Sequence, residues 1–153
     1  MLYKTTSVRS FVWAFLSLTL MTFTACTKKD PTVEVRANQV STTINGSLWQ
    51  SGINNIATTG NLRQVFALKA DSTSVRLYFP ADTIGSFDLA TNSNVTVAYY
   101  EEDVFWNTEV SGTLNITQNS AETLEGTFFG KLVSVFGSDT VSLENGVFYW
   151  RSL

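Results

Sequence analysis

The stretch VSTTINGSLW, residues 40–49, carries the pattern of a β-hairpin. Its first half alternates in side-chain character with a period of two, which is typical of a strand with one buried face. The alternating positions are Val40, Thr42 and Ile44. Asn45-Gly46 follows at once, and this pair readily takes the two positive φ angles of a type I′ turn. The stretch therefore predicts two antiparallel strands joined by a two-residue turn.

The same alternation, interrupted by turn residues, continues to the end of the chain. Further strands are predicted at residues 63–70, 74–80, 85–90, 94–102, 108–118, 122–135 and 139–150. The last of them contains Asn145-Gly146, which predicts a second hairpin turn. No long window shows the periodicity of an amphipathic helix.

These elements predict an all-β protein of about eight to ten antiparallel strands. Two architectures would protect the strand edges: a β-sandwich and a closed antiparallel β-barrel of the lipocalin-like kind. Alternation does not separate them, because both bury one face of each strand. The uneven strand lengths favour the sandwich, and the closed barrel is the alternative.

Composition bounds the function as well as the fold. Hydrophobic residues make up 44% of the 153-residue chain, which is enough apolar material for one packed domain. From Cys26 onward there are 8 basic and 13 acidic residues, a net charge of −5, so a nucleic acid is not an expected partner. The chain has no histidine, which removes the commonest general base and metal ligand. We therefore expect no enzyme activity and no cofactor.

The N-terminal segment has the pattern of an export signal. Lys4 and Arg9 precede an uncharged, mainly apolar run from residue 10 to residue 27. A membrane-spanning helix needs about 20 predominantly apolar residues, whereas serine and threonine residues interrupt this run. A cleaved signal peptide of residues 1–25 is therefore favoured over a retained membrane span.

The single cysteine directly follows this segment. Phe23-Thr24-Ala25-Cys26 resembles the lipobox of bacterial lipoproteins. The resemblance implies cleavage before Cys26 and attachment of lipid to its sulfur, and two or three acyl chains make a durable membrane anchor. The alternative is a free cysteine in an ordinary signal peptide. Residues 26–39 are then a tether, and residues 40–153 form a single β domain.

Lys28-Lys29-Asp30, directly after the cysteine, resembles in part the surface-export signal of lipoproteins from Bacteroidota-type bacteria. The full signal usually has two acidic residues, and only Asp30 stands close here. A solvated charged linker is the alternative interpretation of these residues. We expect a lipid anchor in the outer membrane of the cell envelope, and the sequence does not decide between the surface and the periplasmic leaflet.

Four stretches of the β region carry a wider resemblance. They are INGSLW (44–49), SGTLNIT (111–117), LEGTFFG (124–130) and VSLENGVF (141–148). In this order they are similar to a family of Bacteroidota-type lipoproteins catalogued only as a domain of unknown function. The resemblance implies an anchored β domain, and it brings no known catalytic residues.

Aromatic residues are the best candidates for a binding surface. Adjacent rings on a strand point to opposite faces, so the runs AYYEEDVFW and VFYW place some rings outside a single core. We predict that Trp106, Tyr100 and Phe105 form an exposed ligand-binding face and that Trp49 is buried. The alternative is that both faces of these strands are covered.

The densest acidic cluster is Glu101-Glu102-Asp103. Carboxylates that converge can bind Ca²⁺, which takes six to eight oxygen ligands. Adjacent strand residues diverge, however, and no calcium-loop spacing is present. A solvated acidic hairpin tip is therefore the favoured interpretation, and Glu101 and Asp103 remain weak candidates for a metal site.

Together these features predict an envelope-anchored lipoprotein that binds a glycan or an envelope protein without catalysing a reaction. One alternative is a structural component of an envelope assembly. A remote alternative is a hydrolase that uses two carboxylates, for which sequence spacing in a β domain gives no pairing.

Overall fold

The computed structural model describes residues 38–152. Within that range the chain forms nine β-strands, and paired strands run antiparallel. The strands are β1 (Gln39–Ile44), β2 (Ser47–Thr59), β3 (Leu62–Leu68), β4 (Ser74–Pro80), β5 (Gly85–Asp88), β6 (Thr96–Glu101), β7 (Val104–Asn119), β8 (Thr123–Ser134) and β9 (Thr140–Arg151). The prediction of an all-β antiparallel protein is confirmed.

The described range begins near the end of the predicted tether. The predicted signal peptide, residues 1–25, and the predicted lipid-bearing Cys26 lie outside the described residues. No helix long and apolar enough to cross a membrane occurs within residues 38–152.

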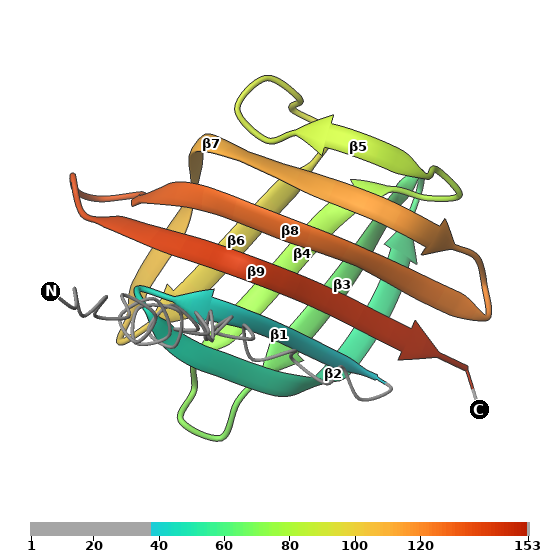
Figure 1. Cartoon of the computed structure of the whole chain (residues 1–153), viewed down its shortest axis with the longest axis horizontal. Coiled ribbons are helices and arrows are strands. Elements are labelled where there is room, and N and C mark those ends of the chain that lie inside the picture. Colours follow the sequence, from blue (N-terminus) through green and yellow to red (C-terminus); the bar gives the residue numbers. More distant parts are fainter. Residues whose placement is uncertain (1–37, 153) are drawn as a thin grey trace, which may run out of the picture. The chain divides into compact units, whose positions relative to one another are not determined.

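The sheet closes on itself. Hydrogen-bonded neighbours follow the order β7-β6-β4-β3-β2-β1-β9-β8, and β8 pairs again with β7. β1 and β9, which are the first and last strands along the described chain, run side by side in Figure 1. The architecture is therefore the closed antiparallel barrel that was the alternative in the sequence analysis, and the favoured sandwich is not adopted.

The uneven strand lengths come from strands that pair with several neighbours. β7 spans 16 residues; its first three residues pair with β6, and residues 113–116 pair with β5. β7 also pairs with β8 along most of its length. Each strand of the ring thus has a neighbour on both sides, which removes the open edges that a sandwich leaves. Length alone could not show this closure.

The interior of the barrel is filled by side chains. Inward-facing residues alternate with outward-facing ones, and the interior set is mainly aliphatic with several rings. Its fully buried large members include Leu77, Phe79, Leu114, Ile116, Leu124, Leu132, Leu143 and Phe148. The rings of Phe79 and Phe148 lie 5.9 Å apart between centroids. The centre of the barrel is therefore a packed core.

The two Asn-Gly pairs take different structures. Asn45 and Gly46 have φ angles of 46° and 84° and join β1 to β2, which confirms the predicted turn. The turn predicted at Asn145-Gly146 is wrong, because β9 runs through it as a bulge. A Cβ atom at Gly146 would lie 2.5 Å from the carbonyl oxygen of Phe128. This glycine lets β8 and β9 approach closely.

The barrel has two different ends. The distal end, as we call it, is formed by the connections at residues 45–46, 69–73, 102–103 and 135–139. The terminal end holds the other connections together with the first and last described residues. There the backbone N–H of Arg151 donates a 2.7 Å hydrogen bond to the Asn38 side chain.

A hydrogen-bond network closes the terminal end. The buried Arg63 guanidinium donates to the Asn119 side chain at 2.8 Å and to the Ser120 carbonyl at 2.7 Å. The Asn119 amide in turn donates to the carbonyl oxygens of Pro80 and Thr83. These bonds connect the ends of β3, β4 and β7. A depression remains at the distal end.

Candidate functional site

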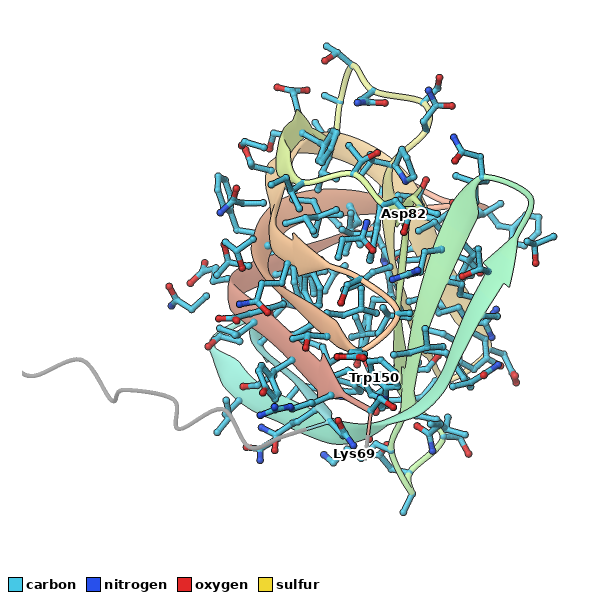
Figure 2. The ribbon with its side chains drawn as sticks, turned by 90° about the vertical axis from the view of Figure 1, so that its right-hand side faces the viewer. Lys69, Asp82 and Trp150 are labelled. Carbon is cyan, nitrogen blue, oxygen red and sulfur yellow. The ribbon has the colours of Figure 1, made fainter. Side chains whose placement is uncertain are left out.

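The depression at the distal end has a volume of about 290 Å³. It is lined by Ile44, Asn45, Ser47, Leu48, Trp49, Lys69, Asp71, Thr73, Tyr99 and Glu101. Ligand pockets range from roughly 300 to 1,000 Å³, so this site has room for one sugar residue or one amino-acid side chain. Figure 2 shows Lys69 far from Asp82, which belongs to the terminal end.

Hydrogen bonds fix the loop between β3 and β4 against the floor of the depression. The Asp71 carboxylate accepts hydrogen bonds from the Thr73 backbone N–H at 3.0 Å and from the Thr73 hydroxyl at 2.6 Å. The Thr73 hydroxyl accepts a 2.8 Å hydrogen bond from Nε1 of Trp49. Lys69 Nζ lies 3.2 Å from the other Asp71 oxygen. Polar groups at the rim are thereby held in place.

The predicted burial of Trp49 is confirmed, since its side chain is only 5% exposed. Its ring lies in the core, and its Nε1–H is hydrogen-bonded to the Thr73 hydroxyl. The ring face is therefore not available for stacking on a ligand.

Two groups of the site have shifted pKa values. The hydrogen bonds from Thr73, and then the nearby Lys69, hold the pKa of Asp71 below its ordinary value of 3.8. Burial, and then the nearby Glu101 carboxylate, raise the pKa of the Tyr99 hydroxyl. At neutral pH the site therefore presents an ionised Asp71 beside a neutral phenol.

The acidic cluster forms the tip of the hairpin between β6 and β7. Glu102 and Asp103 have φ angles of 48° and 66° and make the two-residue turn, so the predicted hairpin tip is confirmed. Glu101 lines the depression, whereas Asp103 accepts a 2.7 Å hydrogen bond from the Tyr100 hydroxyl. Tyr99 and Tyr100 point to opposite faces of β6. The structure therefore does not bring Glu101 and Asp103 together.

The described residues also offer no candidate site made of clustered metal-ligating side chains. Within residues 38–152 no group of three or more Cys, Asp or Glu side chains is arranged to hold a metal ion.

The three aromatic candidates do not form one surface. Trp106 is half-buried, packs against the core, and stacks on Tyr99 with centroids 5.5 Å apart. Its predicted exposure is wrong, because it pairs directly with the inward-facing Tyr99. Tyr100 and Phe105 pair with each other on the outer face and are half-buried. Trp106 Nε1 is buried and has no hydrogen-bond partner among the described residues.

Sequence reasoning missed the exposed apolar residues of the distal end. Leu48 is 61% exposed, Leu68 40%, Val135 45% and Phe136 94%. Phe136 and Gly137 stand between two predicted strands, which was the one available signal that a ring would lie in a turn.

Comparison with models of known protein families identifies the family of this chain. A family model described as "Domain of unknown function (DUF6252)" matches residues 28–150. The chain belongs to this family. The DUF6252 match covers the whole barrel except Arg151, and it confirms the predicted membership of a family catalogued only as a domain of unknown function. No curated protein and no solved structure matches the chain.

Proposed function

We propose that this DUF6252 protein is an envelope-anchored lipoprotein that binds a ligand at its distal end and acts without catalysing a reaction. The anchor is supported by Phe23-Thr24-Ala25-Cys26, which follows an export-signal pattern. Lipid on Cys26 would hold the protein on the outer membrane, and two or more acyl chains would make the attachment durable.

The observation that carries the binding role is the separation of the depression from the chain entry. Asn38, where the described chain begins, lies at the start of β1, and Ile44 and Asn45 at the other end of that strand line the depression. Eleven residues lie between Cys26 and Asn38, so the two can be at most about 40 Å apart when the chain is extended. Attachment at the start of β1 leaves the side of the depression formed by the β1–β2 turn free to meet a ligand.

The depression offers the groups that recognise polar ligands. Asp71 and Lys69 are half-exposed at its rim, and Asn45 and Ser47 are exposed beside them. Fixed polar groups beside apolar ones are typical of recognition sites. Glycans and envelope proteins are the two kinds of ligand that lie within reach of a module anchored in the envelope.

A second candidate function is that of a structural envelope component. It is favoured by exposed apolar residues on the outer wall of the barrel, where Val110 of β7 is 52% exposed and Phe129 of β8 is 56% exposed. Such residues would pack against a neighbour in an assembly.

The anchor is tested by metabolic labelling with palmitate in a host that processes bacterial lipoproteins. We expect the wild-type protein to incorporate the label and to be found in the membrane fraction. Cys26→Ser should not incorporate the label and should be absent from the membrane fraction. Equal fractionation of wild type and Cys26→Ser would remove the anchor from the proposal.

The binding role is tested by affinity purification from membranes of producing cells. We compare wild type with Leu48→Lys at the distal end and with Thr127→Lys, a matched control on the exposed wall of β8. A glycan or protein that co-purifies with wild type and Thr127→Lys but not with Leu48→Lys supports the distal end. A partner retained by Leu48→Lys and lost from Phe129→Lys supports the structural alternative.

A further inference from the structure

Phe136 is highly exposed at the distal end, but the rings that line the depression are not available for the stacking that glycan binding requires. Trp49 and Tyr99 are buried, and Trp106 stacks on Tyr99. Sugars are usually held by flat aromatic faces that stay open to solvent. The rings that line the depression therefore support its floor and leave little surface for stacking.

The exposed apolar groups at this end are mainly aliphatic. Leu48 lies at the start of β2, Leu68 at the end of β3, and Val135 and Phe136 in the loop between β8 and β9. This loop contacts the neighbouring hairpin, because the Val135 N–H donates a 3.0 Å hydrogen bond to the Phe105 carbonyl. Apolar side chains on several connections of one end are typical of a protein-docking surface.

The charge at the same end is strongly one-sided. Among the described residues of its four connections and the adjoining end of β6 there are five carboxylates and one ammonium group. They are Asp71, Glu101, Glu102, Asp103 and Asp139, against Lys69. Lys69 is already paired with Asp71, so the remaining field is negative. Complementarity favours a basic partner.

We infer that the distal end binds a protein segment in which a Lys or Arg side chain is flanked by apolar side chains. The inference rests on the proposed binding function and names its ligand class. The basic side chain enters the depression, where Glu101 forms part of the lining beside the Asp71–Lys69 pair. Its apolar neighbours pack on Leu48 and on Phe136. The volume of about 290 Å³ fits one such side chain.

The same charges argue against a lipid surface as the occupant. Exposed Phe and Leu residues insert into membranes when basic residues surround them, because anionic headgroups attract the basic groups. Here the end of the barrel that carries Phe136 and Leu48 has five carboxylates and one ammonium group, so an anionic bilayer would repel it.

The test is a selection of short random peptides on the full-length lipoprotein, purified in detergent. We expect the enriched peptides to contain Lys or Arg next to Leu, Val or an aromatic residue, and their affinity to fall with added salt. Enrichment of acidic or uncharged peptides, or no enrichment on folded protein, would overturn the inference.

Matched variants localise the binding. Glu101→Gln should weaken the best selected peptide by about tenfold and Phe136→Ser by about fivefold. Glu122→Gln at the terminal end and Phe129→Ser on the outer wall make the same chemical changes elsewhere and should leave the affinity unchanged. Equal losses in the control variants would place the peptide away from the depression and overturn the inference.

A glycan array on the same preparation separates this inference from the proposed function. Binding of a neutral glycan that Leu48→Lys abolishes would overturn the peptide ligand while the distal binding role remained. Absence of glycan binding, together with selected basic peptides, supports the inference.

Discussion

The indole Nε1 of Trp49 donates a 2.8 Å hydrogen bond to the hydroxyl of Thr73. This bond connects the floor of the distal depression, on β2, with its rim in the loop between β3 and β4. Thr73 also donates to Asp71, so one hydroxyl holds both a buried ring and an ionised carboxylate. The stability of the barrel and the shape of the depression therefore depend on the same contact.

Thr73→Val keeps the side-chain shape and removes both hydrogen bonds of the hydroxyl. The buried Trp49 N–H is then left without its partner, which costs about 1–3 kcal/mol of unfolding free energy. Urea denaturation followed by circular dichroism measures the loss. The control is Thr127→Val on the exposed wall, and equal losses in the two variants would contradict this account.

Two identical substitutions at different tryptophans should have different costs. Trp49→Phe removes a paired N–H and should lower the unfolding free energy by about 1–3 kcal/mol. Trp106→Phe removes an N–H that is buried without a partner among the described residues, and this gain offsets part of the lost packing. We expect its cost to stay below about 1 kcal/mol. The same denaturation measurement checks both, and a larger loss for Trp106→Phe would contradict the assignment.

Gly146→Ala tests the bulge that replaces the predicted turn. The added Cβ would meet the Phe128 carbonyl at 2.5 Å and its ring at 2.6 Å, so β8 and β9 must move apart. We expect a loss of about 1–3 kcal/mol. Gly52→Ala is the control, because the nearest atom to its new Cβ, the Asn38 carbonyl oxygen, is 3.8 Å away. Melting temperatures of the two variants should separate clearly, and similar values would refute the close approach at Gly146.

The lowered pKa of Asp71 predicts that the stability of the folded protein depends on pH. Its folded pKa lies below the ordinary value of 3.8, so its ionised form favours the folded state. This contribution is present at and above that value and is lost as the pH falls through the lower, folded pKa. Wild type should therefore lose more stability on acidification than Asp71→Asn. Urea midpoints at neutral and at strongly acidic pH measure the difference, and parallel curves would contradict the role of Asp71.

Strand periodicity predicted most of the barrel wall. The strands expected from 74 to 80 and from 63 to 70 correspond closely to β4 (Ser74–Pro80) and β3 (Leu62–Leu68). The extension of β2 to Thr59 was missed, because its second half lacks strong alternation. Closure was not predictable either, since the pairing of β1 with β9 joins residues about a hundred positions apart.

The candidate site was predicted less well than the fold, and Trp106 shows why. Alternation predicted correctly that Tyr99 and Tyr100 lie on opposite faces, but not which face was the interior. The register between β6 and β7 decides this by pairing Trp106 with Tyr99. Phe136 was missed for a related reason, because exposure in a turn depends on how neighbouring loops pack.

Site-specific photocrosslinking in cells tests most directly the claim that the distal end is the binding surface. A photoreactive amino acid replaces Leu48 at the distal end, and in a second strain it replaces Thr59 at the terminal end; both positions are exposed. We predict a discrete crosslinked product from position 48 and none from position 59. A product from position 59 with none from position 48 would contradict the account.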